Sequence, residues 1–151
     1  SVKYSQLPLT SVKYSQLPLI SLRQAVDRHA EAPSVYRVAA RVVRAFPDDS
    51  LRWTVAREGG TFEYRMVLQL MDTTDSRTLL GAALLGSAGE TFFAGIPPAD
   101  LKESNVSSTL LGARIAALRK ASSVELCLMT CRPDAQNLSE SGVAYHIVGT
   151  R

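Results

Sequence analysis

The stretch FEYRMVLQLM, residues 62–71, is the part of the sequence that decides the fold. Apolar side chains alternate there with charged or polar ones, and a period of two residues is typical of a strand with one buried face. We therefore expect a strand with an inward and an outward face. The predicted inward positions are Phe62, Tyr64, Met66, Leu68 and Leu70, and the polar outward ones are Glu63, Arg65 and Gln69.

Similar patterns on both sides of this stretch predict four more strands. Residues 35–46 alternate before it, and residues 78–85 follow it after a polar turn. The segment 78–85 is apolar at nearly every position, so we expect it to be covered on both faces. Residues 124–131 and 143–150 are the remaining two candidates.

Helical signals occur in two places. Residues 107–121 carry the apolar stripe Leu111, Ile115 and Leu118, with Ser107 or Ser108 as the expected N-cap. Ser21 and Gln24 have the spacing of a capping box, which predicts a short N-terminal helix ahead of Pro33.

The N-terminus contains a doubled motif, SVKYSQLPL, at residues 1–9 and again at 11–19. Two copies without a third do not make a solenoid. The doubling is either native or a copying artefact, and each copy reads as an extended segment that covers the surface. We divide the chain into an extended segment, 1–20, and one globular domain, 21–151, a size that suits a single core.

The order of elements is strand, strand, strand, helix, strand, strand. A helix between the third and fourth strands is the layout of the OB-fold. The predicted fold is therefore mostly β: a five-stranded OB-fold barrel with a helix between strands three and four and a short N-terminal helix.

The sequence gives little support for a catalytic site or a metal site. Neither Cys127 nor Cys131 has an evident histidine partner, and four residues of strand separate their α-carbons by about 13 Å, too far for a disulfide. We expect reduced thiols, no metal, no cofactor and no enzymatic activity. The formal charge of +3 permits an acidic or phosphate-bearing partner without indicating one, and no apolar run is long enough for a membrane span.

Single-stranded nucleic acid is the usual ligand of an OB-fold and is bound through aromatic side chains on the second and third strands. The outward positions of residues 62–71 carry no ring, and residues 78–85 contain none. By strand parity Arg44 falls on the face opposite Arg37 and Arg41. The residues that remain as possible nucleic-acid contacts are Arg37, Arg41, Trp53 and Arg65.

Apolar side chains around the second helix offer an alternative, a protein-docking surface. Ordinary core packing is the competing interpretation of each one. The candidate partner-binding residues are Phe92, Phe93, Ile96, Leu101, Leu110, Leu111, Ile115 and Leu118.

The ordered set of segments resembles the third, C-terminal OB-fold of protection-of-telomeres proteins. The resemblance covers about residues 18–151. It rests on YRV at 36–38 through FP at 46–47, residues 62–72, ETFF at 90–93 with IPP at 96–98, VELC at 124–127 and YHIVGT at 145–150.

This resemblance implies a nuclear protein at telomeric chromosome ends whose C-terminal domain binds the bridging shelterin subunit. Other domains of the full-length protein would bind the telomeric single strand. Animal members carry an inserted domain with cysteine pairs that look zinc-binding between the first two strands. Here residues 48–61 form a short connection without cysteine, so the chain is similar to the compact fungal-type form, without zinc.

Two functions follow as alternatives. The first is a shelterin protein-protein docking domain that supports end protection. The second is a direct single-stranded DNA-binding OB-fold of the replication-protein type, with rings supplied by Trp53 or the N-terminal tyrosines.

Overall fold

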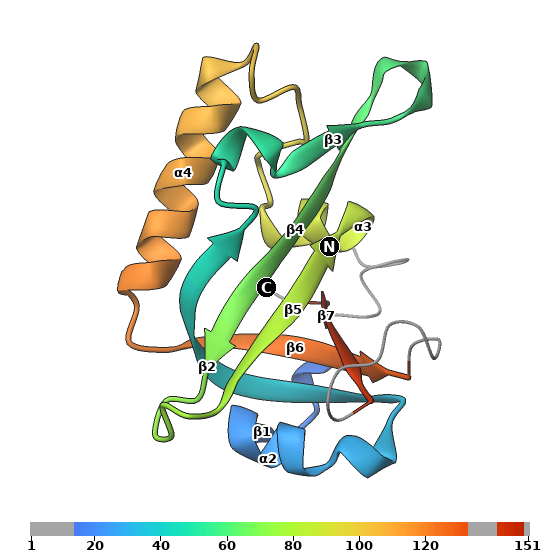
Figure 1. The fold of residues 1–151 in the computed structure, drawn as a ribbon, viewed down its shortest axis with the longest axis vertical. Helices are drawn as coiled ribbons and strands as arrows, with labels where there is room; N and C mark the ends of the chain where they lie inside the picture. Colours follow the sequence, from blue (N-terminus) through green and yellow to red (C-terminus); the bar gives the residue numbers. More distant parts are fainter. Residues whose placement is uncertain (1–13, 133–141, 150–151) are drawn as a thin grey trace.

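A closed ring of five strands forms the centre of the computed structural model, which describes residues 14–132 and 142–149 (Figure 1). The strands are β2 (Ser34–Phe46), β4 (Phe62–Met71), β5 (Leu79–Leu85), β6 (Val124–Cys131) and β7 (Ala144–Val148). Antiparallel pairings join β2 to β4, β4 to β5, β2 to β6 and β6 to β7, and β5 pairs in parallel with β7. This is an OB-type barrel, as the sequence predicts.

The alternation of β4 is confirmed. Tyr64, Met66, Leu68 and Leu70 are buried in one hydrophobic core, while Arg65 is exposed. The same core takes Tyr36, Val38, Ala40 and Val42 from β2. Because both strands bury every second residue, the barrel interior is filled by side chains.

One prediction for β2 is wrong. Arg44 pairs with the outward residue Gln69, so its side chain lies on the same face as that of Arg41. The register shifts between Val42 and Arg44, which is a β-bulge. The extra residue, Val43, resets the alternation and turns Arg44 back toward solvent.

The expectation that β5 is covered on both faces is also wrong for the described residues. Leu79 and Leu85 at its two ends are 49% and 42% exposed, while Ala82 and Leu84 are buried. The strand therefore buries only one face and leaves leucines on the other.

The N-terminal helix is confirmed as α2 (Leu22–Asp27), followed by the short turn η1 (His29–Glu31). Ser21 Oγ accepts from the Gln24 amide at 3.0 Å, and Gln24 Oε1 accepts from the Ser21 amide at 2.9 Å. Before it, β1 (Leu19–Ser21) pairs in parallel with β2. Within the predicted extended segment, Tyr14 and Ser15 are helical, and the Leu17 amide donates to the Tyr14 carbonyl oxygen at 3.1 Å. The chain becomes extended where it joins the sheet at Leu19, and the first copy of the motif lies outside the described residues.

The polar connection between β2 and β4 contains a strand that the sequence did not reveal. It holds η2 (Ser50–Arg52), β3 (Thr54–Ala56) and η3 (Glu58–Gly60). β3 pairs antiparallel with the first three residues of β4, and Gly59 and Gly60 turn the hairpin with φ angles of 85° and 82°. Figure 1 shows this hairpin projecting beyond the ring.

Two helices separate β5 from β6: α3 (Gly86–Phe92) and α4 (Asn105–Lys120), the latter standing along one side of the barrel (Figure 1). The predicted cap of α4 is wrong by about one turn, because Ser104 Oγ accepts from the Ser107 amide at 3.2 Å. Leu111 and Ile115 are buried, as the stripe predicts. No helix of the described residues is long and apolar enough to cross a membrane.

Candidate functional site

Most of the predicted partner-binding residues lie inside the domain. The buried ones are Phe93, Ile96, Leu101, Leu111 and Ile115. Phe93 packs against the rings of Tyr64 and Phe92, with centroid distances of 5.1 and 5.0 Å. These side chains are part of the domain's own core, which leaves them no surface to offer a partner.

The rest of that set lies at or near the surface. Phe92 and Leu118 are half-buried, and Leu110 is 47% exposed. Leu110 shares an exposed face of α4 with Val106, which is 71% exposed, and with the small residues Ala113 and Ala117. Spacings of four, three and four residues place all four on one side of the helix. We call this set the α4 stripe.

A groove of about 810 Å³ lies where β2 ends and β3 begins alongside β4, and we call it the corner groove. Residues of the strands β2, β3, β4 and β5 line it, together with residues of the connecting segments. The apolar lining residues are Phe46, Pro47, Leu51, Val55, Ala56, Phe62, Met66, Val67 and Leu85, and Thr54, Arg52, Arg65, Asp100 and Lys102 complete it.

Two hydrogen bonds from buried residues fix the walls of the corner groove. Trp53 Nε1 donates to the carbonyl oxygen of Pro47 at 2.9 Å, and this bond joins the start of the connection after β2 to its end before β3. Thr54 Oγ1 donates to the carbonyl oxygen of Ala99 at 2.7 Å, which holds the segment that carries Asp100 and Lys102 against β3. The groove is therefore built from rigid parts of the fold.

Positive charge predominates at the corner groove, with three basic lining side chains against one acidic. Arg65 forms an exposed ion pair with Glu63 at 3.2 Å. Asp100 accepts from the backbone amide of Lys102 at 3.1 Å. Arg52 and Lys102 form no ion pair within the described residues, so their charges are available to a ligand.

The groove carries two aromatic rings that the sequence reasoning missed. Phe46 is outward because the β-bulge resets the alternation of β2, and the guanidinium carbon of Arg44 lies 4.8 Å from its ring centroid. Arg44 is itself held by Asp48 at 2.7 Å. Phe62, predicted to face inward, is only half-buried because it lies in the hairpin beyond the ring of strands. The bulge accounts for the placement of Phe46 and the hairpin for that of Phe62, and strand parity shows neither.

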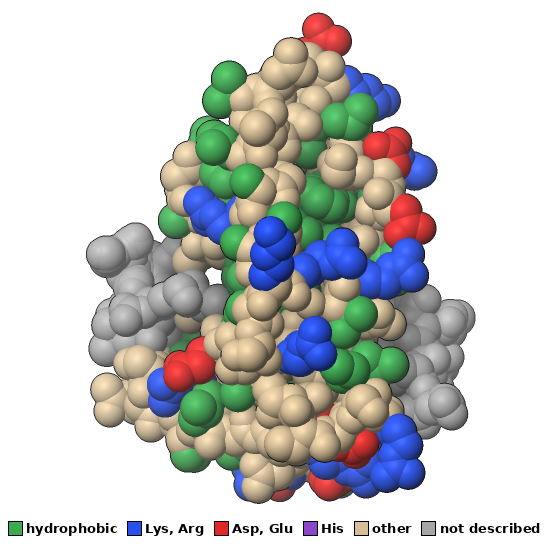
Figure 2. Space-filling model, turned by 90° about the vertical axis from the view of Figure 1, so that its left-hand side faces the viewer, with side chains coloured by type: hydrophobic (Ala, Val, Ile, Leu, Met, Phe, Trp, Pro, Cys, Tyr) green, Lys and Arg blue, Asp and Glu red, His purple; other side chains and the backbone are tan. Residues whose placement is uncertain are grey.

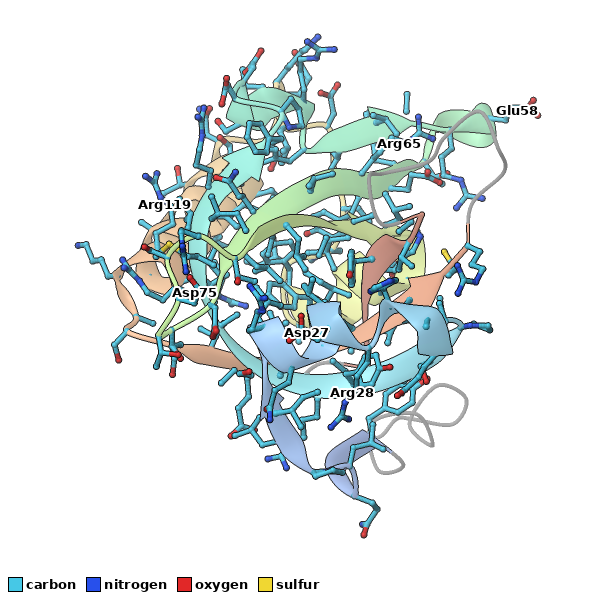
Figure 3. The ribbon with its side chains drawn as sticks, turned by 60° about the horizontal axis from the view of Figure 1, so that its bottom comes forward. Asp27, Arg28, Glu58, Arg65, Asp75 and Arg119 are labelled. Carbon is cyan, nitrogen blue, oxygen red and sulfur yellow. The ribbon has the colours of Figure 1, made fainter. Side chains whose placement is uncertain are left out.

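The predicted nucleic-acid contacts do not come together. Trp53 is only 7% exposed, and Arg37 pairs with Glu125 at 2.7 Å on the β6 side of β2. Arg41 is exposed on β2 and Arg65 on β4. Figure 3 places Arg65 on the hairpin side of the barrel, well away from Arg119 at the end of α4.

A second basic region lies on the α4 side. Figure 2 shows Lys and Arg side chains gathered across the middle of that face, with hydrophobic side chains above them. Arg41 and Arg44 are exposed on β2, and Arg119 and Lys120 form the basic last turn of α4. Arg44 borders the corner groove through its contact with the Phe46 ring, whereas Arg119 lies well away from Arg65 (Figure 3).

Reactive chemistry is sparse in the part of the chain that the structure describes, which holds no group of three or more histidine, cysteine or acidic residues placed to bind a metal. Cys127 and Cys131 form no disulfide. Burial raises the pKa of the Cys127 thiol to about 11 against the lowering effect of Arg37, so the unreactive thiol form prevails at neutral pH.

The sequence matches no protein-family model and no curated protein. The structure is similar to a chain of the crystal structure of fission yeast Pot1 and Tpz1, with a TM-score of 0.71. The similarity covers 89% of this chain and 91% of that chain, at 14% sequence identity. At this level of identity the likeness shows a shared fold.

Proposed function

We propose that this domain is a protein-docking OB-fold of a telomere end-protection complex that binds the bridging shelterin subunit. Two independent comparisons support the telomeric assignment. The ordered sequence segments resemble the third OB-fold of protection-of-telomeres proteins, and the fold resembles a chain of a structure of Pot1 and Tpz1 over nearly its whole length. The proposal places the protein in the nucleus, at chromosome ends, without catalysis.

The observation that carries docking is the composition of the corner groove. Its lining is mainly apolar, and the aliphatic residues Leu51, Val55, Val67 and Leu85 are among those that surround the two rings. Aliphatic side chains bury apolar side chains of a protein partner, whereas bases bind by stacking on open rings. In this proposal other domains of the full-length protein bind the telomeric single strand.

One observation favours the second candidate, direct binding of single-stranded DNA. Phe46 and Phe62 lie in the same groove as Arg52, Arg65 and Lys102, and rings beside cations are what such a ligand requires. The arginine over Phe46 weakens this candidate, because it occupies a face on which a base would stack.

Recruitment to telomeres separates the two functions. The tagged domain is expressed in cells with and without the bridging subunit, and telomeric DNA recovered by chromatin immunoprecipitation is measured. A docking domain loses its telomeric signal when the bridging subunit is depleted. A domain that keeps its signal without that subunit is held at telomeres by another contact, which would refute the docking function.

A further inference from the structure

We propose that the corner groove binds an acidic segment of the partner, which inserts an apolar side chain beside Leu85. This inference rests on the docking function and specifies its site and the chemistry of its ligand. It moves the docking site away from the helix-centred set that the sequence predicts.

The wall formed by β3 supplies the first step. All three residues of β3 line the corner groove. Thr54 is only 6% exposed and its hydroxyl donates to the carbonyl oxygen of Ala99, so β3 is a fixed wall of the groove.

The side chains of the groove supply the second step. Leu51 and Leu85 are 37% and 42% exposed at its surface, and Val67 and Met66 lie beside them. A volume of about 810 Å³ is ample for one or two apolar side chains of a peptide. Covering these leucines removes apolar surface from water, which favours an occupant with leucine-like anchors.

Charge determines what flanks the anchor. Arg52 and Lys102 lie on the connection side of the groove and Arg65 on β4, whereas the Asp100 carboxylate is engaged by a backbone amide. Acidic residues next to the apolar anchor meet Arg52 and Lys102, which form no ion pair within the described residues, whereas Arg65 is already paired with Glu63. The free cations give charge complementarity to an acidic segment.

Single-stranded nucleic acid would satisfy the same cations, but the rings are poorly disposed for it. The Phe46 ring has Arg44 at 4.8 Å, and Arg44 is fixed by Asp48 at 2.7 Å. Phe62 is half-buried. With neither ring fully open, the stacking contribution that dominates single-strand binding is reduced, whereas Leu51 and Leu85 remain open to a peptide.

The test uses a fluorescein-labelled decapeptide that alternates leucine and aspartate, titrated into the 151-residue chain and followed by anisotropy. We expect Leu85→Asp and Arg52→Glu each to weaken binding about tenfold. The matched controls are Leu79→Asp, at the other end of the same strand, and Arg77→Glu, whose side chain is 90% exposed on the turn before β5. Both controls should stay within about twofold of the wild type.

Circular dichroism and thermal melting establish that each variant is folded. Asp at position 85 lies at the N-cap of α3, where an acidic side chain is favourable, so this variant should retain the fold. Arg52→Glu changes an exposed side chain and provides a second test that does not depend on Leu85.

Three outcomes of the peptide titration overturn the inference. The first is absence of peptide binding, and the second is an equal loss of binding in the groove variants and their controls. The third is a single-stranded oligothymidine that binds more tightly than the peptide and competes with it, which assigns the groove to nucleic acid. If Leu85→Asp and Arg52→Glu bind the bridging subunit as wild type does, the groove assignment fails and docking stands. If the wild type does not bind that subunit, docking itself fails.

Discussion

Gly89 of α3 lies directly against Tyr64 of β4, so closely that a Cβ atom at position 89 would stand 2.5 Å from the Cβ of Tyr64. Tyr64 is fully buried, and its hydroxyl donates to the carbonyl oxygen of Ile96. One tyrosine thus joins the central strand, the helix after β5 and the segment that leads to the corner groove. The absence of a side chain at Gly89 allows this packing.

Gly89→Ala should therefore destabilise the domain by about 1–3 kcal/mol through overpacking. The matched control is Gly112→Ala in α4, where an added Cβ meets nothing within 4 Å. That change should stabilise the domain by about 0.5–1 kcal/mol, because glycine is a poor helix former. Urea denaturation measures both, and equal effects of the two substitutions would refute the close packing of α3 on β4.

Tyr64→Phe should lower the free energy of unfolding by about 1–2 kcal/mol, since it removes the donor to the Ile96 carbonyl oxygen while keeping the ring. It should also weaken binding at the corner groove less than Leu85→Asp does, because Tyr64 is fully buried and does not line the groove. Denaturation and peptide titration of the same variant check both statements. Unchanged stability would show that the hydrogen bond contributes nothing.

The decrease in the free energy of unfolding at alkaline pH should depend on Cys127. Burial raises the pKa of this thiol from its ordinary 9.0 to about 11, so the folded state holds the proton more tightly than the unfolded state. Its contribution is complete below pH 9.0 and is lost as pH rises through the folded pKa of about 11. Tyr64, whose pKa burial raises to about 12, adds a loss at higher pH.

The variant Cys127→Ala isolates that effect. The stability difference between wild type and variant should shrink between about pH 7.5 and about pH 10.5, because only the wild type loses the thiol contribution. Urea denaturation at the two pH values measures it. A difference that stays constant would contradict a raised pKa at Cys127.

The α4 stripe offers a test of the helix-centred alternative. Leu110→Ser should change stability by no more than about 0.5 kcal/mol, because the side chain is 47% exposed. Affinity for the bridging subunit should remain that of the wild type if the corner groove is the docking site. A loss of affinity in Leu110→Ser, without one in Leu85→Asp, would return the docking site to α4.

Local patterns in the sequence were enough to predict the barrel and its N-terminal helix. The alternation of residues 62–71 and the pairing of Ser21 with Gln24 each depend on neighbours a few residues apart, and both are confirmed. The outward turn of Arg44 depends on a bulge between paired strands, which strand parity misses. β3 has only three residues and is a strand because β4 is beside it.

The candidate site was the hardest part to predict, because it depends on contacts between segments that are distant in the sequence. Helical spacing places the apolar residues Leu111 and Ile115 on one side of a helix, but they are buried because that side packs against the barrel. The corner groove joins segments around residues 46, 55, 67, 85 and 102, which no local pattern connects. The one signal of the groove in the sequence is the apolar pattern of β5, and that pattern predicts a strand covered on both faces.

The most direct test of the docking function is a parallel titration of the 151-residue chain with a peptide of the bridging subunit and with a telomeric single-stranded oligonucleotide. Protein docking predicts that the peptide binds at least about tenfold more tightly than the oligonucleotide. Leu85→Asp should remove most of that difference, and Leu79→Asp should preserve it. Tight binding of the oligonucleotide without affinity for the peptide would contradict the account.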